Sequence, residues 1–328
     1  MKILGPQRVH FYAPEDEVPH EPGGGELWQE SFVIWLMDAD RDVWAFLRLA
    51  QIPNSRGGRS SVWLNVWTPE HLYHRVEDAR PLEPGFRTKT SLRSGNLCCY
   101  DYRDGDHHWT VDDPEHDVHL EIVQKDFHPG LGYFGKDSGV TKAVSSMHIQ
   151  ACGRVSGTVA VKGQAYRVSG MGWRDHGMGE RRWDAVRTHR FFPAFFGPDL
   201  CTSLVSFVGA DGSLQKTGVI IRNDTVEFTD QFDFVTHFGA DGVSHCGGEV
   251  ALMLGGERVK MRFESVGACS LNLQDGFCCA DSVCKVTMGD RVAVGLCETS
   301  NNSQQGRERP PCHPPGVIDN GIHPRGAK

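Results

Sequence analysis

The sequence predicts a mostly antiparallel, all-β protein, on three observations. Short β-type runs joined by turn residues fill most of the 328 residues, and the chain holds 38 glycines. No stretch keeps the 3.6-residue apolar period of a long helix, although residues 181–192 are compatible with one or two helical turns. The length, with 39% hydrophobic residues, suits two domains or one large β domain, so barrels or sandwiches are expected.

The expected hairpins follow one another along the chain, each with turn residues between two β-rich arms. Their turns lie at 37–42, 162–163, 210–213, 255–256 and 289–290. The Pro-, Gly- and acid-rich segment 1–27 is expected to lie extended over the surface. Residues 299–328 are poor in apolar residues and rich in proline, which predicts a disordered tail.

Composition excludes several classes of function. A net charge of −8 and a pI near 6.0 argue against a general nucleic-acid partner. The N-terminal apolar run is too short for a signal peptide, and no run approaches the ~18 apolar residues of a membrane helix, so a cytoplasmic location is expected. No strand–GxGxxG–helix unit, P-loop or GxSxG is present, which predicts no nucleotide cofactor and no serine hydrolase.

The cysteines and histidines favour no metal or disulfide framework. The chain has 11 Cys without a CxxC, a pattern typical of reduced, mostly buried thiols. The His-rich stretch 107–121 lacks the tight ligand spacing of a tetrahedral zinc site and is interpreted as a polar hairpin.

One segment carries the chemistry: GMGWRDHGMGERRW, residues 170–183. Its charges and indoles are unusual for a plain strand. Two interpretations stay open on the residues alone. The Asp and Arg side chains can form a structural salt-bridge cluster while Trp173 and Trp183 fill the core. Alternatively, the segment lines a functional site.

A hairpin turn at Lys162–Gly163 sets the register of this segment. Counting back from the turn without a bulge places Gln150 opposite Asp175, with His148 diagonal to it. Strand alternation then gathers His148, Gln150, Trp173 and Asp175 on one face, and places Arg174 on the other.

The motif resembles one found in the lipocalin-like superfamily of AttH-like proteins and carotenoid 1,2-hydratases (hydroxyneurosporene synthases). It is most similar to a bacterial family with the pattern G-x-G-W-R-D-H-x-x-G-x-R-x-W. That family is also similar at Trp28 and Glu30 near the start, and at Arg48 and Pro53 after the first hairpin. The resemblance covers most of residues 25–300. It implies two lipocalin-like antiparallel β-barrel domains, expected here at 28–165 and 166–298, with a ligand pocket in or between them.

The resemblance also implies roles for the residues of the shared face. Asp175 matches an Asp implicated in catalysis in the hydratases, and His148 matches their His. Trp173 stands where the hydratases have Tyr, and Gln150 where they have Trp. Some relatives of this architecture are pericyclases, which act mainly by holding a polyene in a reactive shape.

A carboxyl group walled by Trp and Met loses hydration, which predicts a raised pKa and a general-acid role for Asp175. Arg174 and Arg181 can hold a carboxylate or enolate oxygen, or can merely neutralise Asp175 and Glu180. If an Arg paired with Asp175 directly, the pKa of Asp175 would fall and its general-acid role would weaken. The candidate catalytic residues are Asp175, His148 and His176. The candidate substrate-binding residues are Trp173, Gln150, Arg174, Arg181, Trp183, Trp28 and Glu30.

Two functions remain. The favoured one is a cofactor-independent lyase or isomerase, a hydratase, dehydratase or cyclase of secondary metabolism, acting on an apolar terpenoid, polyketide or aromatic substrate. The alternative is a lipocalin-like carrier of a small hydrophobic molecule. An inward acid beside an imidazole favours the enzyme, because a carrier needs only shape and apolar walls. A monomer or homodimer is expected.

Overall fold

The computed structural model describes residues 1–328 except 6–7, 56, 134–138, 240–241, 275–276, 303–315, 318 and 326–328. Nearly all of its regular structure is strand. The helical elements of the described residues are the helix α1 (Gly139–Val144) and the 3-10 turns η1 (Pro14–Glu17) and η2 (Trp183–Ala185). No helix in these residues has the length and apolar character needed to cross a membrane.

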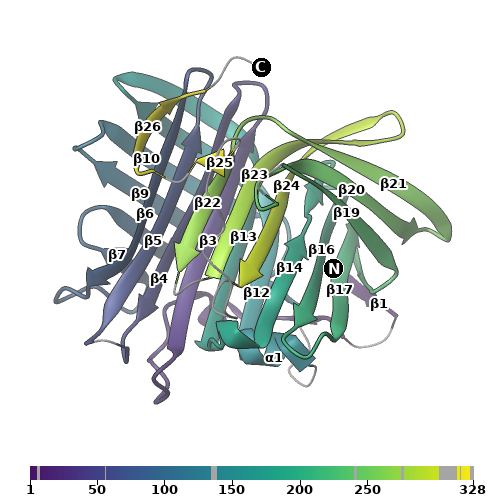
Figure 1. Ribbon diagram of the computed structural model, residues 1–328, viewed down its shortest axis with the longest axis horizontal. Coiled ribbons are helices and arrows are strands. Elements are labelled where there is room, and N and C mark those ends of the chain that lie inside the picture. The colour runs from purple at the N-terminus through teal and green to yellow at the C-terminus, as the bar shows by residue number, and fades with distance from the viewer. Residues whose placement is uncertain are drawn as a thin grey trace.

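The strands form two large sheets that lie beside each other in Figure 1. The first sheet runs in the order β26-β6-β5-β4-β3-β13-β12-β10-β9-β8-β7, with β2 and β11 attached at β12. Its strands are β2 (His10–Phe11), β3 (Trp28–Asp38), β4 (Val43–Ile52), β5 (Arg59–Trp67), β6 (His71–Pro81), β7 (Ser91–Ser94), β8 (Cys98–Arg103), β9 (Asp106–Asp113), β10 (Val118–Asp126), β11 (Leu131–Gly132), β12 (Met147–Val161), β13 (Gln164–Glu180) and β26 (Gly321–Pro324).

The second sheet runs in the order β1-β18-β17-β16-β14-β24-β23-β21-β20-β19, with β15, β22 and β25 attached to it. Its strands are β1 (Lys2–Leu4), β14 (Val186–Phe191), β15 (Ala194–Phe195), β16 (Leu200–Gly209), β17 (Leu214–Arg222), β18 (Thr225–Thr229), β19 (Phe232–Phe238), β20 (His245–Leu254), β21 (Glu257–Ser265), β22 (Cys269–Gln274), β23 (Phe277–Met288), β24 (Arg291–Asn302) and β25 (Gly316–Val317). Among the described strands, only β1–β18 and β22–β25 pair in parallel. The expected all-β class with two lipocalin-like antiparallel domains is confirmed.

The β12–β13 hairpin confirms the register counted from its turn. Lys162 and Gly163 have φ of 52° and 74°, the left-handed conformation of a tight two-residue loop. Gln150 lies opposite Asp175, and the ladder continues without a bulge to Met147. The glycines of the motif serve this pairing, because a Cβ on Gly170 would lie 2.3 Å from the carbonyl oxygen of Met37 on β3.

Alternation along β3 and β13 separates two cores. Trp35 and Trp173 point toward the second sheet, where they join Phe195 and Phe207 in a core shared by both sheets. Ile34 points the other way into a core that belongs to the first sheet alone. The first sheet curls around that core, in which strands β7 to β10 pack back on β3 to β5.

The chain ends cross between the sheets. The N-terminal β1 pairs with β18 of the second sheet, and β26 pairs with β6 of the first. Part of the expected disordered tail is therefore a strand: Ile322 packs on the core of the first sheet, and the Arg325 guanidinium bonds Asp42 and the carbonyl of Val266. Residues 299–302 of the expected tail also belong to a strand, β24, and residues 303–315, 318 and 326–328 lie outside the described residues.

The N-terminal segment is extended, as expected, but it is not wholly superficial. Glu17 is only 4% exposed, because η1 places its carboxylate against the first sheet. The boundary expected at residue 165 falls at the tip of the β12–β13 hairpin, whose two strands share one sheet. The change from the first sheet to the second comes after β13, and the domain bounds stay a prediction.

Candidate active site

A cavity of about 130 Å³ lies between the two sheets. Strands β3, β4, β5, β12 and β13 supply one wall, and β14, β16, β23 and β24 supply the other. About half of the lining residues are aromatic or aliphatic, and nearly as many are polar. These polar side chains include Arg48, His148, Gln150, Asp175, Arg181, His189 and Glu298.

Asp175 is the most heavily partnered group of the first wall. Its Oδ2 lies 2.8 Å from His148 Nε2 and accepts a hydrogen bond of 2.6 Å from Gln150 Nε2. Gln150 is itself held by Tyr133 and Ser203, which both donate to its Oε1. The triad of His148, Gln150 and Asp175 therefore comes from one hairpin face, and Tyr133 and Ser203 fix its orientation.

The pKa of Asp175 is lowered, so the expectation of a raised pKa is wrong. Burial is the largest single influence and raises the pKa, but the combined opposing influences outweigh it. These are the charge and hydrogen bond of His148, the hydrogen bond of Gln150 and the charge of Arg181. Asp175 is therefore a carboxylate at neutral pH, in contact with the imidazole of His148.

Glu298 on β24 is the carboxyl group of the opposite wall. Its Oε1 lies 2.5 Å from His189 Nε2, and its side chain is 13% exposed. Burial and the negative charge of Asp175 together raise the pKa of Glu298 to about 7, although the hydrogen bonds of Asp281 and Cys279 and the charge of Arg48 oppose the rise. Burial also lowers the pKa of His189 to about 3. Glu298 therefore holds a proton near neutral pH beside a neutral imidazole.

Sequence reasoning missed Glu298, although the signal was available. The turn at Gly289–Asp290 is one of the expected hairpins, and counting back along its arms places Glu298 opposite Asp281. The same counting located Asp175. Counting from the turn does not reveal that the β23–β24 hairpin faces the β12–β13 hairpin across the cavity.

The structure divides the sequence-predicted site residues into two groups. Those in the cavity lining are Asp175, His148, Gln150, Arg181 and Trp183. Those outside the lining are His176, Trp173, Arg174, Trp28 and Glu30.

The second group has structural surroundings. Trp173 shares the face of Asp175 but is fully buried in the core between the sheets, with its ring 5.3 Å from that of Phe195. Arg174 points to the other face, where its guanidinium pairs with Glu17 and Asp126 at 2.6 Å each. Its substrate-binding role is not supported, because both carboxylates lie on the far side of the first sheet. Trp28 is buried at the start of β3.

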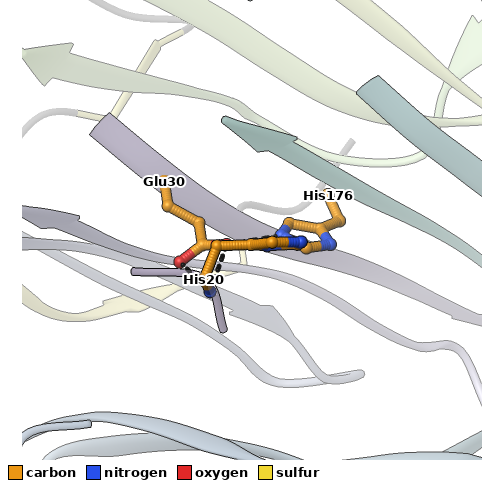
Figure 2. A group of neighbouring side chains, drawn as sticks. All are labelled: His20, Glu30 and His176. Atoms are coloured by element: carbon orange, nitrogen blue, oxygen red, sulfur yellow. Dashed lines mark hydrogen bonds and ion pairs between the residues drawn. The ribbon is translucent and has the colours of Figure 1, made fainter. Parts of the chain in front are cut away.

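Glu30 and His176 belong to a cluster on that far side, together with His20 (Figure 2). The Oε1 of Glu30 lies 2.8 Å from His20 Nδ1 and 3.0 Å from His176 Nε2. The backbone N–H of His20 and the amide of Gln51 also donate to this carboxylate. These hydrogen bonds fasten the N-terminal segment to the sheet, so neither Glu30 nor His176 reaches the cavity.

Two of these groups combine residue types that can hold a metal ion. They are His20 with Glu30 and His176, and His189 with Cys279 and Glu298. In both, the nitrogen and oxygen atoms lie at hydrogen-bond distance, 2.5 to 3.0 Å, closer than the ~3.4 Å expected between ligands of a tetrahedral zinc ion. Burial raises the pKa of Cys279, which disfavours the thiolate that binds zinc. The ten cysteines of the described residues are all free thiols.

The sequence as a whole identifies the family. A model described as "Domain of unknown function (DUF7064)" matches residues 13–303. The chain belongs to this family. No curated protein matches this DUF7064 chain.

Solved structures share the DUF7064 fold at low identity. The AttH-like protein NE1406 of Nitrosomonas europaea is 13% identical, with a TM-score of 0.64 over 88% of this chain and 96% of that one. CghA with Sch210972 is 10% identical, with a TM-score of 0.61 over 89% and 97%. Kievitone hydratase of Nectria haematococca is 9% identical, with a TM-score of 0.56 over 89% and 92%. The resemblance to the AttH and carotenoid-hydratase superfamily is confirmed at the level of the fold.

Proposed function

We propose that this DUF7064 protein is a cofactor-independent lyase or isomerase of the hydratase, dehydratase or cyclase type. Its substrate is a small apolar molecule of the terpenoid, polyketide or aromatic class, held in the cavity between the sheets. The observation that carries the proposal is the His148–Asp175 pair, joined at 2.8 Å inside a cavity that is lined in part by Trp and Phe side chains. Among structures of this fold, one is named a hydratase and another holds a small molecule.

The two walls supply two different proton-transfer groups. Asp175 is ionised and orients His148, which accepts or returns a proton as a general base or acid. Glu298 faces them from the second sheet and keeps its proton near neutral pH. Titratable groups whose environments push their pKa values apart are typical of paired acid and base catalysis. Adding water to a double bond or removing it uses a proton donor and a proton acceptor, and a proton-started cyclisation uses a donor.

The aromatic walls suit such chemistry. Trp183 stacks on Phe277 with ring centroids 3.8 Å apart, which gives the cavity a rigid apolar floor. Aromatic faces bind apolar substrates and stabilise a developing positive charge through their quadrupole. Proton donation followed by capture or loss of water can therefore proceed without a cofactor.

The test is a screen of terpenoid, polyketide and aromatic candidates in D₂O, with products analysed by mass spectrometry. We expect deuterium at carbon in the product of a hydration or a proton-started cyclisation, whereas a dehydration gives a product lighter than the substrate by one water. Asp175→Asn should keep ligand affinity, since the amide is nearly isosteric, but it should lower kcat by at least ~10²-fold. Asp290→Asn, in an exposed turn, is the matched control.

Two outcomes contradict the proposal. Turnover of Asp175→Asn at the wild-type rate would show that the His148–Asp175 pair does no chemistry. Tight binding of a ligand with no turnover in any variant would favour the alternative, a lipocalin-like carrier, which needs the cavity but not the proton-transfer groups.

A further inference from the structure

We propose that the substrate carries an anionic oxygen group, a carboxylate or an enolate, and that Arg48 and Arg181 bind this group in the cavity. The inference rests on the proposed function, since it specifies the substrate class for the same cavity. Among the described residues, these two arginines have no direct counter-ion.

Two guanidinium groups line the cavity without an ion pair. Arg48 is 3% exposed and donates to neutral partners, Ser61 at 3.2 Å and Gln274 at 2.9 Å. The Arg181 guanidinium lies 5.2 Å over the ring of Trp183, and its Nε is buried without an acceptor. Among the described residues, no carboxylate forms an ion pair with either group.

The other fully buried arginines of the described residues are ion-paired. Arg174 is bonded to two carboxylates, and the Arg59 guanidinium lies 3.2 Å from Asp78. An isolated buried charge costs several kcal/mol unless it is paired. Arg48 is as buried as these two but has no ion pair, and it lines the cavity, where a ligand can supply a counter-ion.

The two positive charges, on Arg48 and Arg181, also repel each other. The pKa of Arg48 is lowered to about 9, first by burial and then by the charge of Arg181. Burial lowers the pKa of Arg181 to about 10, against the charge of Asp175. With Glu298 protonated, Asp175 is one negative charge near two positive ones, so the cavity has an excess positive charge that an anion would neutralise.

Neighbouring hydrogen-bond donors also support an anionic ligand. The indole N–H groups of Trp35 and Trp63, both in the lining, have no acceptor among the described residues. Guanidinium and indole N–H groups are donors without acceptor capacity. This side of the cavity therefore offers donors to an oxygen-rich group. If His148 removes a proton next to a carbonyl, the same donors stabilise the enolate oxygen that forms.

The experiment compares two ligands with the same ring system and similar size, the anionic 2-naphthoate and the neutral 2-naphthalenemethanol, by isothermal titration calorimetry at pH 7. We expect the wild type to bind the carboxylate at least ~10-fold more tightly, the equivalent of about 1.4 kcal/mol. Equal affinity for the two ligands, or binding of neither at millimolar concentration, would overturn the proposal.

Variants assign the preference to the cavity. Arg181→Met and Arg48→Met should each remove most of the preference for the carboxylate while leaving affinity for the alcohol within about twofold. The control is Arg182→Met, a neighbouring guanidinium that is 60% exposed and paired with Asp184; it should keep the preference. A loss of affinity that is equal for both ligands would assign the arginines to packing and contradict the proposal.

This binding test is independent of turnover. A preference for the carboxylate without turnover on any screened substrate would support anion recognition while the proposed reaction fails. Turnover of neutral substrates with no preference for the carboxylate would leave the proposed function intact and overturn only the anion site.

Discussion

Replacing Glu298 by Gln should stabilise the protein at alkaline pH and leave it unchanged at acidic pH. Burial raises the pKa of Glu298 from 4.5 to about 7. Between these values the folded protein keeps a proton that the unfolded chain releases. The folded state then binds more protons, so the free energy of unfolding falls as pH rises through this window. Gln mimics the protonated acid and removes this loss.

The magnitude follows from the size of the pKa shift. Each unit is worth about 1.4 kcal/mol, which sets an upper limit of about 3 kcal/mol for the whole window. The Glu298 side chain is 13% exposed, and Asp281 shares its hydrogen bond and also has a raised pKa. Both features spread the titration over the pair, so we expect a difference of about 1–3 kcal/mol at pH 8.

The assay is urea unfolding followed by tryptophan fluorescence at pH 4, 5, 6, 7 and 8. The variant and the wild type should unfold at nearly the same urea concentration at pH 4, diverge between pH 5 and pH 7, and keep a constant difference above pH 7. Glu227→Gln, an exposed glutamate of β18, is the control and should show no divergence. A Glu298→Gln variant that is less stable at pH 8, or equally displaced at every pH, would refute the reasoning.

Two further predictions concern stability. Lys162→Asn should raise the free energy of unfolding by up to about 1 kcal/mol, because Lys162 has a φ of 52° and Asn before Gly is favoured in such a turn; no gain in urea denaturation would show that the hairpin tip is not strained. Glu17→Ala should cost about 3 kcal/mol, because it removes one of the two carboxylates that neutralise the buried Arg174, and unchanged urea denaturation would contradict that role.

Local pairing was the part of the site that could be predicted from sequence. A two-residue turn and strict alternation place His148, Gln150 and Asp175 on one face, because antiparallel pairing without a bulge leaves no freedom of register. The same rule put Arg174 on the opposite face, and the structure agrees.

Long-range partners could not be predicted in this way. Arg174 is neutralised by Glu17 and Asp126, which come from η1 and β10, and no local pattern links these three positions. Trp173 has the correct face, yet its height along the strand puts it against Phe195 rather than in the cavity lining. Which residues face each other across two sheets depends on how the sheets pack, and the periodicity of a single strand does not encode that packing.

The wrong expectation for the pKa of Asp175 has a different origin, because the local register had already placed its partners His148 and Gln150 beside it. Asp175 and Glu298 are both carboxyl groups in one cavity, and burial raises the pKa of each. Their partners decide the outcome. Asp175 receives hydrogen bonds from an imidazole and an amide and lies near the charge of Arg181. Glu298 instead meets the neutral His189 and a second carboxyl group, Asp281.

In the proposed mechanism each sheet contributes one member of an acid and base pair, and both sheets line the cavity. The base side is built by β12 and β13, and the acid side by β14, β23 and β24. Any change in how the sheets pack alters the separation between the two proton-transfer groups. The crossing of β1 and β26, each of which pairs with the sheet at the other end of the chain, ties the two halves together and so helps to keep that separation constant.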